Sequence, residues 1–145
     1  MHRFKHEPVQ NNDGLFWDWQ FIIQQIKTGL LAATKLGQVV SVGVDSWAVD
    51  YGLIDKDGDV IGQPHCYRDG RTDGVMAKLK QDLGVDYIYG KTGIQFIFFN
   101  TMYQLFVEKD TAAYQRADKF LMVPDLINYT CLLYTSPSPR DAHES

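Results

Sequence analysis

The sequence predicts a domain of the α/β class, in which helices cover a β-sheet. Two runs rich in β-branched and aromatic residues, Val39–Val44 and Val49–Ile54, predict neighbouring strands. An apolar stripe at helical spacing predicts a helix that covers one face of this sheet: Trp19, Ile22, Ile23, Ile26 and Leu30. The length of 145 residues suits a single domain.

Composition narrows the class of protein. Hydrophobic residues make up 45% of the chain and charged residues 22%, which is an ordinary globular balance. A net charge of −4 argues against a nucleic-acid partner, because no basic stripe is present to displace phosphate counterions. No apolar run approaches the roughly 20 residues that span a bilayer. No signal-peptide pattern is visible, and Cys66 and Cys131 do not make a disulfide framework, so we expect a cytoplasmic protein.

The first half of the chain predicts a turn, a helix and a hairpin. Asn11–Gly14 predicts the turn, and Asp18 caps a helix that ends near Gly37. His2 and His6 stand at the spacing of a metal pair, but without a third ligand nearby they are interpreted as solvated. Lys56–Asp59 then predicts a tight turn that returns the second strand through Val60 and Ile61.

The second half predicts mainly helices. We expect them at Thr72–Leu83, briefly within Val85–Gly93, after Asn100, around Ala112–Ala117 and from Pro124. The apolar run Ile94–Phe99 predicts a buried segment. Two Ser-Pro pairs after Thr130 predict a disordered tail, so we expect a domain over residues 1–129 and a non-native tail over residues 130–145.

Two polar clusters are the candidate binding residues. Asp45 and Asp50 flank Trp47 where the first strand ends, and ionised carboxylates suit a core poorly. Carboxylates and an aromatic plate suit a polyol pocket, although a strand-end cluster satisfied within the protein explains them equally well. Arg68, Asp69 and Arg71 precede a helix N-terminus, where they can staple a loop or bind an oxygen-rich ligand.

No complete catalytic motif accompanies these clusters. The sequence contains no Walker loop, GxGxxG, CxxC or GxSxG pattern. Cys66 follows His65, but adjacent residues of an extended segment point apart, which favours a structural role for the thiol. The residues alone therefore indicate an α/β domain with a candidate sugar pocket.

Five colinear blocks resemble the FGGY family of carbohydrate kinases. They read SVGVDSWAVDYGLID from Ser41, YRDGRT from Tyr67, TGIQF from Thr92, FNTMYQL from Phe99 and LMVPDLINY from Leu121. The resemblance implies a partial N-terminal domain with a ribonuclease-H-like, actin-like core. It also implies transfer of the γ-phosphoryl group of ATP, with Mg²⁺, to the 1-hydroxyl of L-rhamnulose in rhamnose catabolism. The aspartate base of the family lies beyond the matched region, so no catalytic, cofactor-binding or metal-binding residue is assigned.

The resemblance places one substrate residue on this chain. A substrate-contacting glycine of the family falls on Ala48, where the added methyl group could crowd a close approach by the sugar. The other residues that we expect in the pocket wall are inferred from the matched blocks: Trp47, Asp50, Arg68, Asp69 and Arg71.

The chain departs from the family pattern at both ends of the sequence. Met1 falls where the family is already some way into its first domain, and the Ser-Pro tail replaces a Leu-Thr-Gly-like segment. We therefore expect a fragment that is inactive by itself. Two alternatives stay open: an FGGY kinase for another ketose or polyol, and a non-catalytic sugar-binding module.

Overall fold

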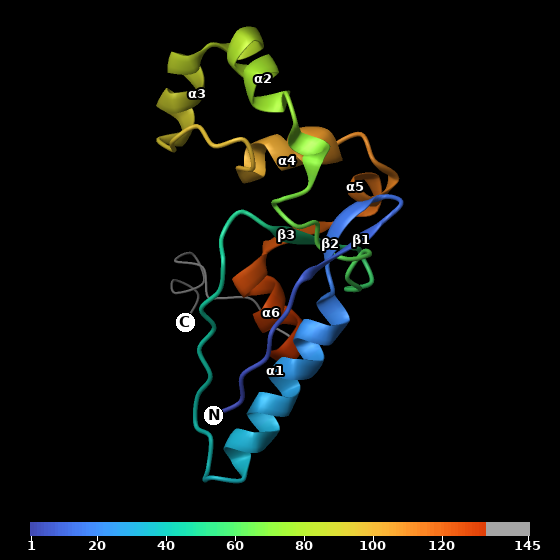
Figure 1. Ribbon diagram of the computed structural model, residues 1–145, viewed down its shortest axis with the longest axis vertical. Helices are drawn as coiled ribbons and strands as arrows, with labels where there is room; N and C mark the ends of the chain where they lie inside the picture. The colour runs from blue at the N-terminus through green and yellow to red at the C-terminus, as the bar shows by residue number, and fades with distance from the viewer. Residues whose placement is uncertain (133–145) are drawn as a thin grey trace.

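The computed structural model describes residues 1–132 as an elongated, mixed α/β molecule with helices at both ends (Figure 1). The element order is β1 (Pro8–Asn11), β2 (Gly14–Trp17), α1 (Trp19–Thr34), β3 (Tyr51–Ile54), the 3₁₀ turn η1 (Gly70–Thr72), α2 (Val75–Leu83), α3 (Val85–Thr92), α4 (Thr101–Glu108), α5 (Ala112–Arg116), β4 (Lys119–Met122) and α6 (Val123–Leu132). Helices α1 and α6 form one end and the α2–α3 hairpin the other, with β3 and β4 between them. None of the helices in residues 1–132 has the length and apolar character that crossing a bilayer requires.

Strands β1 and β2 form a hairpin around the predicted turn, with Asn11 opposite Gly14. Gly14 has φ +139°, and a Cβ there would lie 2.7 Å from an oxygen of Asp69, so a larger residue would collide with that carboxylate. The hairpin is fastened to the segment around His65 by hydrogen bonds from the Trp17 N–H to the Pro64 carbonyl and from the Cys66 N–H to the Leu15 carbonyl, each 2.9 Å long. This contact brings the N-terminal hairpin to the segment that carries Arg68, Asp69 and Arg71.

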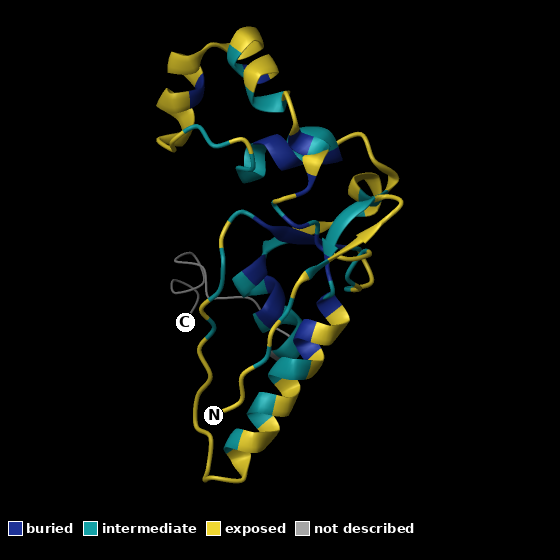
Figure 2. Ribbon diagram, viewed as in Figure 1, coloured by how far each residue is buried: buried dark blue, intermediate teal, exposed yellow. Residues whose placement is uncertain are grey.

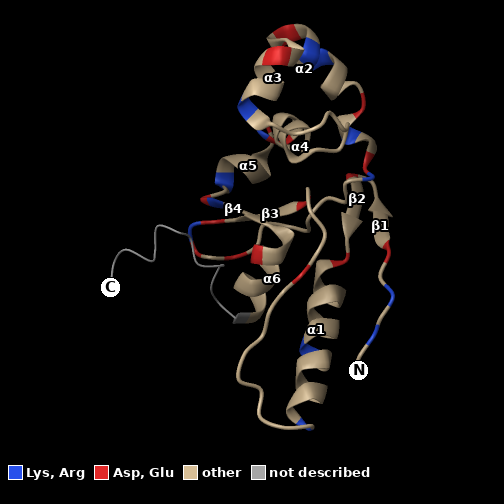
Figure 3. Ribbon diagram, turned by 90° about the vertical axis from the view of Figure 1, so that its left-hand side faces the viewer, with Lys and Arg blue, Asp and Glu red and all other residues tan. Residues whose placement is uncertain are grey.

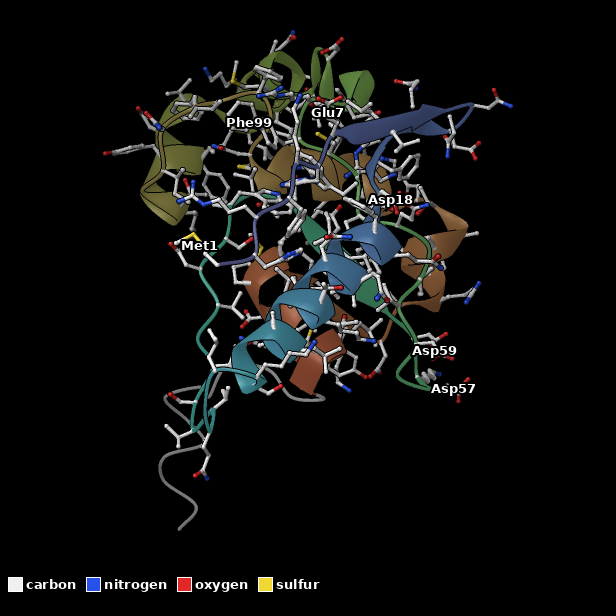
Figure 4. The ribbon with its side chains drawn as sticks, turned by 60° about the horizontal axis from the view of Figure 1, so that its bottom comes forward. Met1, Glu7, Asp18, Asp57, Asp59 and Phe99 are labelled. Atoms are coloured by element: carbon white, nitrogen blue, oxygen red, sulfur yellow. The ribbon has the colours of Figure 1, made fainter. Side chains whose placement is uncertain are left out.

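Helix α1 confirms the predicted apolar stripe and its cap. The Asp18 carboxylate accepts a hydrogen bond of 3.0 Å from the Phe21 N–H, and Asp18 stands at the start of the helix in Figure 4. Trp19 and Ile23 pack with Ile54 and with residues of α6 in one core cluster. The helix ends at Thr34, three residues before the predicted stop at Gly37.

The predicted strand Val39–Val44 is wrong. The segment is extended but has no ladder partner among the described residues, and β3 pairs instead with β4 from far along the chain, Tyr51 opposite Met122. A strand needs a neighbour for its N–H and C=O groups, which local sequence cannot supply. Val40 is 85% exposed, and Figure 2 shows most of the stretch as solvent-exposed chain beside α1, whereas Val44 is half-buried against the core cluster of Ile54.

Only a short part of the predicted hairpin after β3 forms. Val60 forms a single bridge with Ile54, and the Ile61 N–H donates to the Leu53 carbonyl at 2.8 Å. Gly58 takes φ +90°, as the Asp-Gly turn requires. Asp57 and Asp59 lie at the tip of this turn, away from the rest of the molecule (Figure 4).

Helices α2, α3 and α4 form a small lobe around Leu79, Ile88 and Tyr103. The helix predicted from Thr72 begins at Val75, because Gly74 takes φ +77° and interrupts the turn before it. Charges of both signs mark the α2–α3 hairpin, as expected for a solvated pair of helices (Figure 3). The prediction that Ile94–Phe99 is buried is wrong, since Ile94 is 57% and Phe98 46% exposed on the connection between α3 and α4.

Helices α5 and α6 are found where the sequence predicts them. Thr111 caps α5 through a 3.2 Å hydrogen bond from the Tyr114 N–H, and Pro124 lies in the first turn of α6. The domain boundary expected after Tyr129 falls inside α6, which continues to Leu132. The remainder of the predicted tail, residues 133–145, lies outside the described residues.

Candidate functional site

A strained corner at Val49 is the centre of the candidate site. Val49 has φ +71°, and it is the one non-glycine residue with positive φ in the described part of the chain. A β-branched residue pays a steric penalty in this conformation, which persists only where surrounding contacts impose it. The corner therefore has a fixed shape that the local sequence would not choose.

Helix α4 holds this corner in place. The Val49 carbonyl accepts hydrogen bonds from the Thr101 hydroxyl at 2.8 Å and from the Gln104 side-chain amide at 3.2 Å. Thr101 and Gln104 lie one turn apart on the same helical face. Their two donors fix the direction of the Val49 carbonyl, and with it the peptide between Val49 and Asp50.

Asp50 is a fully buried acceptor behind the corner. Its Oδ2 accepts from the indole N–H of Trp17 at 2.6 Å, the indole N–H of Trp47 at 3.0 Å and the Tyr67 N–H at 3.3 Å. Its Oδ1 accepts from the Gln104 amide at 3.2 Å. Burial raises the pKa of the Asp50 carboxyl, and these hydrogen bonds oppose the rise. The carboxylate is satisfied within the protein and faces the fold.

The Trp47 indole is packed against other rings. It stacks on His6 with ring centroids 5.5 Å apart, and it contacts Trp17 at 4.9 Å. Trp47 also borders the core clusters around Ile54 and Cys66. The ring that the sequence suggested as a plate for sugar thus serves as packing between the N-terminal segment and the corner.

The three charged residues after Tyr67 have different environments. The Asp69 carboxylate accepts from the Leu15 N–H at 2.5 Å and from the Arg71 N–H at 2.7 Å, so it fastens β2 and caps η1. Arg68 is exposed, with its guanidinium 5.4 Å from the centroid of the Tyr67 ring. Of the two roles considered from the sequence, fastening a loop fits Asp69, whereas the Arg68 side chain is exposed to solvent.

Arg71 joins the two polar clusters. Its guanidinium forms an ion pair with Glu108 and donates to the Gln104 side-chain oxygen at 2.8 Å. Gln104 in turn donates to Asp50, so a continuous chain of hydrogen bonds runs from Trp47 to Glu108. The structure therefore brings the two predicted clusters together, through a side chain of α4 that belongs to neither.

Two cavities flank this network. The more polar one, of about 140 Å³, is lined by His65, Arg71 and Glu108 among other residues. Burial, with a smaller contribution from Arg71, lowers the pKa of His65 from 6.5 to about 4. His65 is therefore neutral at physiological pH and adds no charge to this side of the network.

The larger cavity, of about 350 Å³, lies on the other side of the corner. Ala48 and Val49 line it from the corner, and α3, α4 and the 94–100 connection supply most of the other walls. Ala48 is exposed, so a ligand in this cavity can reach its methyl group. Of the six predicted site residues, Ala48 is the one that lines this larger cavity.

No metal site is assigned in the described residues. Residues 1–132 contain no group of three or more His, Cys, Asp or Glu side chains that could hold an ion. Cys66 is fully buried beside Trp17 and Ile22, and burial raises the pKa of its thiol, which suits a packing role.

Sequence reasoning missed the residues of α4 that hold the site. Gln104 and Glu108 are 2% and 6% exposed, and neither was among the candidate residues drawn from the sequence. One signal was present: Gln104 and Glu108 stand at i and i+4 on a mostly apolar helix, and such pairs share a face. The strain at Val49 has no signal in the sequence.

Comparison with known proteins decides the family. The profile described as "FGGY family of carbohydrate kinases, N-terminal domain" matches residues 4–133. The chain belongs to this family. The strained corner and its cavity are therefore features of an FGGY kinase domain, and the match includes every residue of the polar network.

Curated relatives of this FGGY chain are rhamnulokinases. The rhamnulokinase of Yersinia pestis is 47% identical over 130 residues, and that of Bacillus subtilis is 44% identical over 133 residues. The rhamnulokinase of Mannheimia succiniciproducens is 43% identical over 132 residues, or 89% of this chain. The chain spans 27% of the length of each of these proteins.

Solved structures of sugar kinases share the fold. A gluconate kinase from Lactobacillus acidophilus superposes with a TM-score of 0.75 and a ligand-bound xylulose kinase from the same organism with 0.76, each at 15% identity. The superpositions cover 87% and 88% of this chain and 27% of each kinase. They support the ribonuclease-H-like, actin-like fold class expected from the sequence.

Proposed function

We propose that this chain forms the sugar-side wall of a kinase that phosphorylates L-rhamnulose at its 1-hydroxyl with ATP. The observation that carries the proposal is the Val49 corner, whose strain is sustained by α4 beside an accessible cavity. The identity of 43–47% to rhamnulokinases supports the choice of sugar.

The residues of the wall bind and orient the sugar, and they do not transfer the phosphoryl group. Ala48 is the proposed contact with the ketose, and exposed Arg68 is a second one. Trp47, Asp50, Asp69 and Arg71 hold the corner and its approach through the buried network. Such positioning matters because phosphoryl transfer depends on placing the hydroxyl in line with the phosphate.

ATP with Mg²⁺ would supply the transferred phosphoryl group and neutralise its charge. No residue of 1–132 is assigned to either, since the described side chains offer no metal-binding group and no phosphate loop was recognised. We place the reaction in the cytoplasm, where ATP is available. Because the chain spans 27% of the rhamnulokinases, we expect no ADP release from the 145-residue chain alone with ATP and L-rhamnulose.

A chimaeric enzyme tests the proposal. Residues 4–133 of this chain replace the matching part of the Bacillus subtilis rhamnulokinase, and ADP formation is followed with L-rhamnulose, D-xylulose and D-gluconate. We expect turnover with L-rhamnulose to exceed the other two by at least roughly tenfold, since discrimination by binding pockets is commonly of that size. A folded chimaera that prefers another sugar would favour a different FGGY kinase. A folded chimaera that binds L-rhamnulose without turnover would favour the non-catalytic module.

A further inference from the structure

The larger cavity is mainly apolar. Its lining includes Ala48, Val49, Ile88, Ile94, Phe96 and Met102, with Met122 at the end of β4. These residues come from the corner, α3, the 94–100 connection, α4 and β4. A lining of this kind favours apolar groups of a ligand.

Most polar side chains of the lining already donate within the protein. The Thr101 hydroxyl donates to the Val49 carbonyl at 2.8 Å, and the Asn100 amide donates to the Gln95 carbonyl at 2.8 Å. The Thr92 hydroxyl donates to the Ile88 carbonyl at 3.0 Å. Gln95 and Tyr103 supply the remaining polar groups of the lining. A hydroxyl at the end of a sugar would lose its hydrogen bonds to water in this cavity. It would find few hydrogen-bond partners in the lining, which makes its binding unfavourable.

L-rhamnulose is a 6-deoxyketose, so one of its ends is a methyl group. We propose that the cavity receives this C6 methyl group and thereby distinguishes L-rhamnulose from L-fructose, which differs only by a hydroxyl at C6. This inference rests on the proposed function, because it takes L-rhamnulose as the substrate. It makes Ile94, Met102 and Met122 specificity-determining residues, while the corner at Ala48 holds the middle of the sugar.

The expected discrimination follows from the chemistry of the lining. An apolar pocket separates ligands that differ by one methylene by roughly 10- to 200-fold, and rejects an added hydroxyl by up to about 100-fold. The cavity opens to solvent at Ile94, which is 57% exposed, so the lower end of this range applies. We expect the Kd of the chain for L-fructose to exceed that for L-rhamnulose by about tenfold.

The methionines of the chain make a direct test possible. Two of the four, Met102 and Met122, line the cavity, whereas Met1 and Met76 do not. The 145-residue chain, labelled with ¹³C at the methionine methyl groups, is titrated with each ketose and followed by NMR. We expect L-rhamnulose to shift the Met102 and Met122 signals, with those of Met1 and Met76 unchanged, and L-fructose to need about tenfold higher concentration.

Two matched variants test whether the discrimination between the two ketoses arises in this cavity. Ile94→Thr places a hydroxyl in the lining, and Val85→Thr makes the same kind of change on α3 at a residue that is 47% exposed and outside the lining. We expect the ratio of the two Kd values to fall several-fold in Ile94→Thr and to stay unchanged in Val85→Thr. Because both residues are exposed, neither variant should unfold the protein.

Four outcomes overturn the inference. Equal Kd values for the two ketoses would show that the cavity does not sense C6, and so would ratios that are the same in Ile94→Thr and Val85→Thr. Shifts confined to Met1 and Met76, or no shift with L-rhamnulose, would place the sugar elsewhere. In each case the phosphorylation assay of the chimaera decides separately whether the proposed function stands.

Discussion

Asp50 shows how a single buried carboxylate can hold a strained corner through hydrogen bonds within the protein. From the sequence it is a poor core residue, and the structure resolves this by surrounding it with donors. Two of these donors, Trp17 and Gln104, lie 33 and 54 residues away along the chain. Local pattern therefore identified the residue but could not reveal whether it faces a ligand or the protein.

Replacing Asp50 should destabilise the fold. Asp50→Ala leaves the indole N–H groups of Trp17 and Trp47 and the Gln104 amide without their acceptor, which we expect to lower the free energy of unfolding by about 2–4 kcal/mol. Urea denaturation at pH 7 measures the change. Asp45→Ala is the control, since Asp45 is exposed and should change stability by less than about 0.5 kcal/mol. Equal effects of the two substitutions would contradict the role assigned to Asp50.

His65 gives the fold a pH dependence. Its pKa is about 4 in the folded chain and 6.5 in the reference state, so between these values the unfolded chain binds the additional proton. The contribution of neutral His65 to stability is therefore complete above pH 6.5 and is lost as the pH falls towards 4. The groups that face it are Arg71, which lowers the pKa, and Glu108 and Asp69, which raise it.

His65→Phe should remove this dependence while keeping the ring that packs on Phe16. We expect the free energy of unfolding of the unsubstituted chain to fall, relative to the variant, by about 2–3 kcal/mol between pH 6.5 and pH 4. Denaturation curves across this range provide the measurement. Asp50 titrates in both proteins, so its effect cancels in the difference. His2→Phe, at an exposed histidine, should follow the unsubstituted chain, and a parallel course for His65→Phe would refute the assignment.

At the scale of elements, the helices were predictable and the sheet was not. Helix α1 follows from an apolar stripe and its Asp18 cap, and α2 ends at Leu83 as predicted, because these signals are local. Strand β3 pairs with β4, about 70 residues away, and the run Val39–Val44 has no ladder partner among the described residues. The β-propensity of a segment shows that it can adopt an extended conformation. Whether the segment joins a sheet depends on whether the fold places another strand beside it.

The contact between β3 and α6 allows no side chain at Gly52. A Cβ there would lie 2.5 Å from a methyl carbon of Leu126, which is fully buried. We expect Gly52→Ala to lower the free energy of unfolding by about 1–3 kcal/mol through overpacking. Thermal denaturation would detect this loss. Gly37→Ala serves as the control, because no atom lies within 4 Å of a Cβ there, and a loss as large as that of Gly52→Ala would argue against close packing of β3 on α6.

At the scale of the whole molecule, the candidate site lies where distant elements meet. The corner precedes β3, the residues that hold it lie on α4, and the carboxylate behind it also binds Trp17 of β2. The sequence predicted the family and the residues of both polar clusters. It could not show that Gln104 joins them, or that Ala48 rather than Trp47 lines the larger cavity, since both depend on how α4 packs against the corner.

The most direct test of the account is the effect of Ala48→Leu on the chimaeric kinase. Ala48 is exposed at the edge of the cavity, so a leucine there should obstruct the sugar and leave the fold intact. We predict that KM for L-rhamnulose rises at least roughly tenfold while the melting temperature is unchanged, as expected when ligand binding alone is impaired. Ala112→Leu, at an exposed position on α5, should leave both quantities unchanged. An unchanged KM in Ala48→Leu would contradict the claim that this corner contacts the ketose.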